Sequence, residues 1–407
     1  MNHIRLVSCF VLYFFGATLA FSNSAYSETT SEADAEYVKR FQEKFPPVDP
    51  APALAAYATP AKYDELFMGE RLSKALEKVS NNQGGIAWGL ADRMTSLNEM
   101  FRNTEDTKYL QANLECIRAV LAARDDRRGV TLWTGKIAPA WSSDKYAERG
   151  RAVFAVHTGM ILYPILDFLS LTKGLPEFKE SLGAEFETIL HDANETLVYH
   201  DRQWRDGPSE QEGHYIGVDQ ENVLEGKPLP GNRLSAMGRA LWMSWKVSGN
   251  DTHRDRAVAL GRYIRNRLYL GSDGAYYWAY WLTENGVGNA PPPADLRGED
   301  ASHASLTITL PALLAAEGQV FTSEDSARLC KTVTNVLARL DNGVLFGDVA
   351  GRPTSNPNHA AHPADWLRLS PFRPDVYERL SLFYTRYQSR PNPLDIALLI
   401  RYRSATP

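Results

Sequence analysis

The chain has 407 residues, of which 44% are hydrophobic and 23% are charged, and both values are ordinary for a globular protein. This composition allows a large core and argues against extensive disorder. The formal net charge is -5 and the sequence pI is about 6.0, which argues against nucleic acid as a partner. An anionic substrate remains compatible with these values, because an acidic protein can contain a local basic pocket.

The first residues have the pattern of a secretory signal peptide. Arg5 supplies a positive charge, residues 6–21 form an apolar run, and Ala25 and Ser27 are small residues placed for cleavage after position 27. A membrane anchor is the alternative, but the apolar run is short for a span and small polar residues follow it. We therefore expect residues 1–27 to be removed. We expect the mature protein to be periplasmic or secreted, with no insertion into a membrane.

Two cysteines, Cys116 and Cys330, remain in the mature chain. Two cysteines in a large exported protein do not make a disulfide framework. Both lie in apolar helical patterns, so we expect buried thiols, with a single bridge as the alternative. After the signal region, no apolar run reaches the length that we expect of a transmembrane span.

Residues 28–62 are rich in proline, alanine and acids, and we expect them to form an N-terminal lead-in that wraps the body. Residues 63–407 are predicted to form a single domain of helix pairs. Each pair is broken by a short polar loop, and these loops lie at residues 103–107, 173–174, 248–250 and near 318. A final pair is expected around residues 374–402.

Within each pair the first helix is the more apolar and the second has a charged face. A helix that is apolar all round is buried, whereas an amphipathic helix lies at the surface. Alternating inner and outer helices predict an all-α fold, an (α/α) toroid of about six or seven helical hairpins with short strands at the rim. An irregular helical bundle is the alternative.

In a toroid, the end of each outer helix and the start of the next inner helix lie at the same rim. The segments at these junctions are rich in aromatic and charged residues, whereas the loops within the pairs are plain. Binding residues gather on loops held by a rigid scaffold, so this rim is the predicted site. The rim candidates are Trp133, Lys136, Trp141, His157, residues 200–217, Asn232, Arg233, residues 273–281, Arg297, Glu299, Asp300, His303, His359 and His362.

Aromatic faces with arginine, histidine, asparagine and acids suit a carbohydrate. One chemistry is β-elimination on a uronic-acid polymer, in which cations or amides neutralise the carboxylate and a side chain moves the proton. A tyrosine can act as both base and acid if neighbouring cations lower its pKa. The residues Arg205, Tyr215 and His157 provide the required types.

Hydrolysis by a pair of carboxylates is the second chemistry. The available carboxylates are Asp206, Glu212, Glu299 and Asp300. The many basic and aromatic groups at the rim favour an anionic substrate.

Four segments, "AVHTGMILYPI", "HDRQWRD…EGHYIG", "NRLSAMGRAL" and "EDASHASL", occur in this order along the chain. In this order the sequence resembles the toroidal polysaccharide lyases that act on glucuronan and alginate, over roughly residues 85–400. The resemblance implies a tyrosine as base and acid, with a histidine and an arginine at the substrate carboxylate. The matching positions are Tyr215, His157 and Arg205, and Tyr277 and Tyr280 are the rival tyrosines.

Further rim residues are predicted to bind substrate: Trp204, His214, Asn232, Arg233, Tyr277, Tyr280, Arg297, Glu299 and His303. Asn232 could instead cap a helix, and the acids could complement a helix dipole. His359 and His362 lie in a proline-rich loop without the spacing of a metal site, so neither a metal nor a cofactor is expected. The sequence lacks a glycine-rich phosphate loop and a nucleophile-elbow motif.

The sequence therefore predicts an exported lyase that cleaves an anionic, uronic-acid polysaccharide by β-elimination. The alternatives are a glycoside hydrolase or a uronate epimerase on the same scaffold, or a non-catalytic sugar-binding protein.

Overall fold

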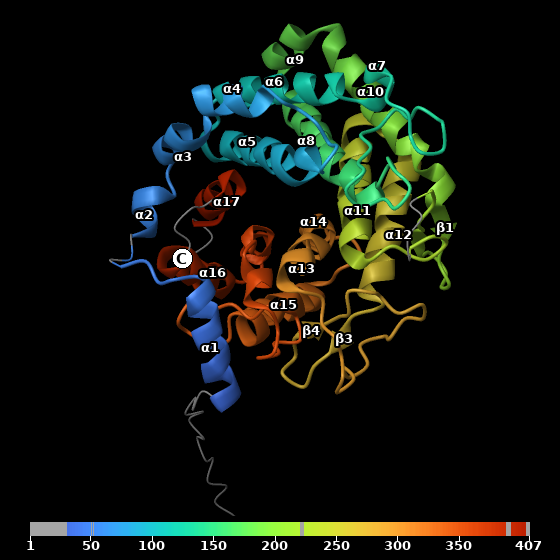
Figure 1. Cartoon of the computed structure of the whole chain (residues 1–407). Coiled ribbons are helices and arrows are strands. Elements are labelled where there is room, and N and C mark those ends of the chain that lie inside the picture. Colours follow the sequence, from blue (N-terminus) through green and yellow to red (C-terminus); the bar gives the residue numbers. More distant parts are fainter. Residues whose placement is uncertain (1–30, 50, 52, 220–223, 388–391, 404–407) are drawn as a thin grey trace, which may run out of the picture.

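The computed structural model describes residues 31–49, 51, 53–219, 224–387 and 392–403. The predicted signal peptide lies outside these residues. Helices dominate the fold and are arranged as a ring (Figure 1). The predicted α/α toroid with short strands is confirmed.

An inner ring of helices surrounds the centre. Each inner helix contacts the next along the chain, and the last packs against the first, which closes the ring. The inner helices are α5 (Ala91–Thr104), α8 (Ala155–Lys173), α11 (Gly231–Ser248), α13 (Ala301–Thr307), α14 (Thr309–Ala316), the 3₁₀ helix η5 (Ala364–Leu369) and α17 (Pro393–Arg403).

An outer layer covers this ring. The main outer helices are α6 (Lys108–Ala122), α10 (Ala184–Tyr199), α12 (Asp251–Arg265), α15 (Ser323–Lys331) and α16 (Pro374–Arg386). The remaining helical elements are α1 (Glu32–Lys44), α2 (Leu54–Tyr57), α3 (Pro60–Phe67), α4 (Glu70–Leu76), η1 (Ile86–Leu90), α7 (Asp125–Arg128), α9 (Pro176–Leu182), η2 (Asp201–Gln203), η3 (Thr332–Leu337) and η4 (Pro357–Ala360).

Two antiparallel hairpins interrupt the helices. Strands β1 (Trp204–Asp206) and β2 (Gly213–Tyr215) pair in one, and β3 (Tyr269–Leu270) and β4 (Tyr276–Tyr277) pair in the other. Each hairpin follows an outer helix and precedes the next inner helix, where the sequence predicts rim strands.

The helix ends follow from local signals in the sequence. Helix α11 ends at Gly249, whose φ of 74° is the left-handed conformation that glycine adopts without strain. Helix α15 begins with a capping box, in which the Thr322 and Asp325 side chains bond each other's backbone N–H groups. The predicted breaks within the pairs are therefore confirmed.

Helix α8 is the core of the fold. By length and composition it could cross a membrane, but 89% of its apolar window is buried inside the protein. The sequence-based view that no later run reaches this length is therefore wrong for α8, whose apolar character serves the inner ring.

Helices α8 and α11 approach very closely at Gly159. A Cβ atom added there would lie 2.3 Å from the carbonyl carbon of Ala236, a distance that real Cβ atoms do not show. Because only glycine fits, this contact fixes the spacing of two helices whose first turns carry His157, Asn232 and Arg233.

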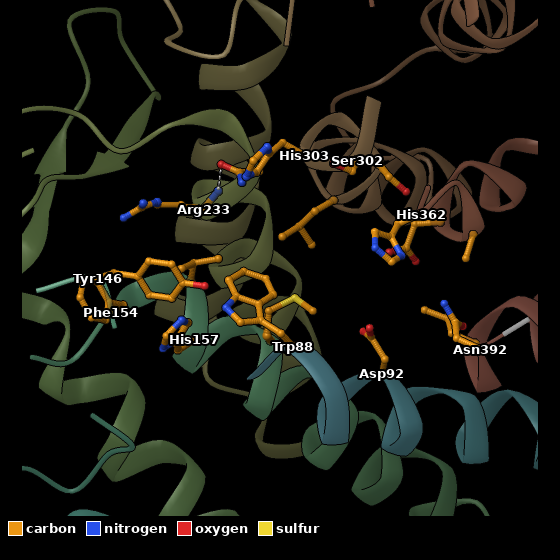
Figure 2. A pocket seen from close by; sticks show the side chains of 18 of the residues that line it. Trp88, Asp92, Tyr146, Phe154, His157, Arg233, Ser302, His303, His362 and Asn392 are labelled. Carbon is orange, nitrogen blue, oxygen red and sulfur yellow. Dashed lines mark hydrogen bonds between the residues drawn. The ribbon is translucent and has the colours of Figure 1, made fainter. Parts of the chain in front are cut away.

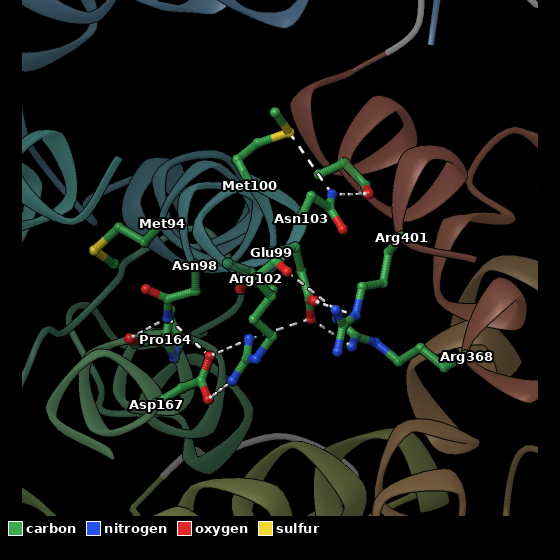
Figure 3. Close-up of polar contacts among 12 residues, drawn as sticks. Met94, Asn98, Glu99, Met100, Arg102, Asn103, Pro164, Asp167, Arg368 and Arg401 are labelled. Atoms are coloured by element: carbon green, nitrogen blue, oxygen red, sulfur yellow. Dashed lines mark hydrogen bonds and ion pairs between the residues drawn. The ribbon is translucent and has the colours of Figure 1, made fainter. Parts of the chain in front are cut away.

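A network of charges joins the two ends of the ring (Figure 3). Arg102 on α5 forms an ion pair with the buried Asp167 of α8. Glu99 on α5 accepts a hydrogen bond of 3.0 Å from Arg368 of η5 and lies 3.9 Å from Arg401 of α17. Ion pairs as well as apolar packing thus stabilise the contact between the first and last inner helices.

The N-terminal lead-in contributes to the core through α1. Tyr37 and Phe41 are fully buried; Tyr37 stacks on Phe346 at 4.6 Å, and Phe41 packs edge-on against Phe383. Helix α1 therefore lies against the C-terminal part of the ring, as expected for a segment that wraps the body.

Candidate active site

A cavity of about 450 Å³ opens at one end of the toroid (Figure 2). Its lining comes mainly from the first turns of the inner helices, because these turns meet at the same rim. The lining residues are Trp88, Asp92, Lys145, Tyr146, Phe154, Val156, His157, Met160, Asn232, Arg233, Tyr280, Ser302, His303, Ser305, Leu306, His362, Ala364, Asp365, Asn392 and Leu394.

Two carboxylates of this cavity, Asp92 and Asp365, differ in environment. Burial, and next the negative charge of Asp365, raise the pKa of Asp92 to about 7, although Arg239 opposes the shift. Asp365 forms an ion pair with Arg368, whose Nε donates a hydrogen bond of 2.8 Å to it. The cavity therefore contains one carboxyl group, Asp92, that holds its proton up to about pH 7, and a second, Asp365, that is paired with a cation.

His157 lies inside a box of aromatic rings. Trp88 and Tyr146 form T-shaped pairs with the imidazole, with ring centroids 5.4 and 5.6 Å away, and the Phe154 ring centroid lies at 5.3 Å. Burial, followed by the positive charges of Arg233 and Lys145, lowers the pKa of His157 to about 3. His157 is therefore neutral at physiological pH.

His303 behaves in the opposite way because it has a carboxylate partner. Its Nδ1 lies 2.5 Å from Asp300, the residue that caps α13, and this hydrogen bond raises the pKa of His303. The ring of Tyr280 packs edge-on against the imidazole at 5.3 Å. The pKa values of the two cavity histidines are thus shifted in opposite directions.

The cavity has a cationic side and an acidic side. Figure 2 shows His157, Tyr146 and Phe154 on one side, Asp92 and Asn392 on the other, and Trp88 between them. Arg233 and Lys145 belong to the side of His157, since both act on the pKa of this histidine.

Five of the predicted site residues line the cavity: His157, Asn232, Arg233, Tyr280 and His303. They come from four segments far apart in the sequence, and the toroid brings them together at its rim. Their roles in binding or catalysis remain predictions.

The predicted residues of the β1–β2 hairpin do not reach the cavity. Tyr215 is 1% exposed and packs beneath Trp204, with ring centroids 5.3 Å apart, while His214 stacks on Tyr263. Arg205 is exposed and donates to backbone carbonyls of its own turn. The expectation that Tyr215 and Arg205 lie beside His157 is wrong, because the hairpin folds outward against α12.

Three other predicted residues also lie outside the cavity lining. Tyr277 donates a hydrogen bond to Asp273, and Arg297 is exposed in a loop. Glu299 is fully buried; Trp278 and Thr307 donate hydrogen bonds to it, and burial raises its pKa to about 8. Glu299 is therefore a buried structural carboxyl in this geometry.

Two candidates for a carboxylate pair are also misplaced. Asp206 lies on the β1–β2 hairpin, and Glu212 is buried in an ion pair with Arg267 at 3.1 Å. The carboxylates that do line the cavity, Asp92 and Asp365, were not predicted as this pair.

One sequence signal could have revealed Asp92. Trp88 and Asp92 are spaced four residues apart at the start of the first inner helix, which is the position that His157 and Asn232 occupy in later pairs. Both residues lie at the start of the first helix pair, whereas the rim candidates predicted from the sequence all follow it. Lys145, Tyr146 and Asn392 carry no comparable signal.

Metal binding has no support within the described residues. No group of three or more histidine, cysteine, aspartate or glutamate side chains is arranged there to hold a metal ion.

The sequence matches no protein-family model and no curated protein. Among solved structures, the chain is similar to an unsaturated glucuronyl hydrolase specific for heparin, with 10% identity, a TM-score of 0.50, and coverage of 86% of this chain and 96% of that chain. A D-mannose isomerase gives 11% identity, a TM-score of 0.49, and coverage of 86% and 98%. The chain is also similar to an inactive variant of an α-1,6-mannanase of Salegentibacter sp. HEL1_6, in complex with α-1,6-mannotriose. This match has 12% identity, a TM-score of 0.45, and coverage of 84% of this chain and 98% of that chain.

These neighbours are carbohydrate-processing enzymes with an α/α-toroid fold. At 10% identity, the similarity to the unsaturated glucuronyl hydrolase establishes the fold of this chain and leaves its chemistry to its own residues.

Proposed function

We propose that the protein is an exported glycoside hydrolase that acts on an anionic, uronate-containing saccharide. The observation that carries this proposal is the pair of carboxyl groups that line one cavity, Asp92, whose pKa is raised to about 7, and Asp365, which forms an ion pair with Arg368. Glycosidic hydrolysis requires one carboxyl that gives a proton and one carboxylate that activates water or attacks the sugar. Asp92 takes the first role and Asp365 the second.

The rest of the lining supports a sugar as the substrate. Trp88, Tyr146 and Tyr280 supply aromatic surface, and 39% of Trp88 and 40% of Tyr146 is exposed. Lys145 and Arg233 supply positive charge for a carboxylate. The N-termini of α8 and α11 add partial positive charge at the same side.

A lyase is the second candidate, and one observation favours it. His157, Asn232, Arg233 and Tyr280 line the same cavity and include the residue types that β-elimination needs. However, burial raises the pKa of Tyr280 more than Arg233 lowers it, which is unfavourable for a base. The hydrolytic pair therefore comes first.

One assay separates these functions. The mature protein is incubated with glucuronan, alginate and pectate, and with a neutral mannan as the control. New reducing ends without ultraviolet absorbance from an unsaturated product support hydrolysis, whereas both signals together would establish the lyase. Binding without either signal would favour a sugar-binding protein, and turnover of the neutral polymer alone would contradict an anionic substrate.

A further inference from the structure

A side chain behind the cavity wall determines which hydrogen the His157 ring carries. Asn81 is 4% exposed, does not line the cavity, and lies in the loop before η1. Its Nδ2 lies 3.1 Å from His157 Nδ1 and donates to the carbonyl oxygen of Trp141 at 3.0 Å. Its Oδ1 accepts the backbone N–H of Ala87 at 3.1 Å.

These contacts define the orientation of the Asn81 amide. The Trp141 carbonyl can only accept a hydrogen bond and the Ala87 amide can only donate one. A flipped amide would place oxygen against oxygen and N–H against N–H, and both bonds would be lost. The amide nitrogen must therefore face His157 and donate to its Nδ1.

Because Asn81 donates to Nδ1, only one tautomer of the neutral His157 ring is compatible with this contact. Nδ1 has to be an unprotonated acceptor, so the neutral ring carries its hydrogen on Nε2. Nε2 is buried and has no hydrogen-bond partner in the structure, and the residue lines the cavity. The ring thus offers one unused N–H group to whatever fills the cavity.

The surroundings oppose a second proton on this ring. Lys145, beside the ring, and Arg233, on α11, are positive, and both oppose a further positive charge on His157. His303 shows the contrast within the same cavity, because a carboxylate, Asp300, faces its Nδ1 where an amide faces that of His157.

We propose that Asn81 is a positioning residue that holds His157 in its neutral, Nε2-protonated form. In this form the ring is a fixed hydrogen-bond donor to an oxygen of the bound sugar and takes no part in proton transfer. The identity of the acceptor rests on the proposed function, whereas the state of the ring does not.

Nuclear magnetic resonance of protein labelled with ¹⁵N in the histidine rings tests the state of the ring directly. His157→Gln assigns the signal by its disappearance. We expect the shift pattern of a ring protonated at Nε2 alone, unchanged from about pH 5 to about pH 8. A ring that titrates in this range, or that carries its hydrogen on Nδ1, would overturn the proposal whether or not the protein is a hydrolase.

Two substitutions test the donor role. Glutamine at position 157 keeps an N–H donor but cannot move protons, whereas leucine keeps neither ability. We expect His157→Leu to lower kcat/KM by about 10²- to 10³-fold, and His157→Gln to retain activity within about 10-fold with the wild-type pH profile. Equal loss in both variants, in folded protein, would show that the ring transfers protons.

His191→Gln is the matched control, because His191 is exposed on the outer helix α10 and lies far from the cavity lining. It should change neither the kinetics nor the assigned signal.

Asn81→Asp tests the positioning role. The carboxylate can still accept from Ala87 but cannot donate to Nδ1, so it would draw a hydrogen onto that nitrogen and raise the pKa of His157. Nε2 then donates only while the ring is doubly protonated. We expect kcat/KM to show an additional fall as pH rises through this new pKa, beside the loss of activity that Asp92 already gives the wild-type enzyme. An unchanged profile with an unchanged ring signal would contradict the proposal.

Discussion

Asp92 is the residue whose change should affect activity most. Asp92→Asn removes the proton donor, so we expect kcat to fall by about 10²- to 10⁴-fold while the fold is kept. The wild-type enzyme should lose activity as pH rises through about 7, where burial and Asp365 place the pKa of Asp92. Steady-state kinetics across pH check both expectations. Asp255→Asn is the control, because Asp255 is an exposed acid on α12.

The same substitution should also change stability in a pH-dependent way. The pKa of Asp92 in the folded state lies above the ordinary value of a carboxyl, so the folded protein holds this proton more tightly than the unfolded chain. The stabilisation exists at acidic pH and is lost as pH rises through about 7. Asp92→Asn should therefore raise Tm relative to the wild type more at alkaline than at acidic pH. Thermal melts of the variant and the wild type, at one acidic and one alkaline pH, measure this difference in Tm.

Tyr215 offers the opposite expectation. It is buried beneath Trp204 and away from the cavity, so Tyr215→Phe should leave kcat/KM unchanged within about twofold. The hydroxyl contributes about 1 kcal/mol at most to the free energy of unfolding, which chemical denaturation can measure. A loss of turnover in folded Tyr215→Phe would return the catalytic role to this tyrosine. Tyr280→Phe is the comparison within the cavity.

At the scale of elements, the contact between α8 and α11 controls the site. Gly159→Ala would force Ala236 away, so we expect a loss of about 1 to 3 kcal/mol of stability. It should also lower kcat/KM, because His157 lies on α8 and Arg233 on α11, and a shift of the two helices would displace both side chains. Gly89→Ala is the matched control, since a Cβ at Gly89 meets open space, and it should be neutral or stabilising by under about 1 kcal/mol. Equal effects in the two variants would contradict this interpretation.

The elements also show which parts of the structure a sequence can predict. Helix α8 is apolar all round and α12 has a charged face, and these local patterns were sufficient to predict inner and outer helices. The direction of the β1–β2 hairpin depends on tertiary packing, in which Gly213 lets the Trp204 ring lie against the strand. The burial of Tyr215 follows from that packing and has no local signal. Asp92 by itself resembles a surface acid in a helix, and only its place four residues after Trp88 at the start of an inner helix distinguishes it.

At the scale of the whole molecule, the ring depends on its buried charges. Arg102→Met would leave Asp167 buried and unpaired on one side, so we expect a loss of about 3 to 5 kcal/mol in the free energy of unfolding. Replacing Asp167 by leucine in the same chain removes the stranded charge and should restore much of the stability. Denaturation of both variants tests the pair, and a double variant no more stable than Arg102→Met would argue against it.

The two buried thiols can report on local opening of the toroid. Cys116 on α6 and Cys330 on α15 are both free and fully buried, and burial raises the pKa of each to about 12. Neither thiol can be labelled until its part of the ring opens, because the reactive thiolate is both inaccessible and scarce. Labelling rates at the two positions, distinguished by mass spectrometry, therefore time the opening of opposite parts of the chain. Equal labelling rates would mean that the ring opens as one cooperative unit. Unequal rates would show which part of the ring unfolds first.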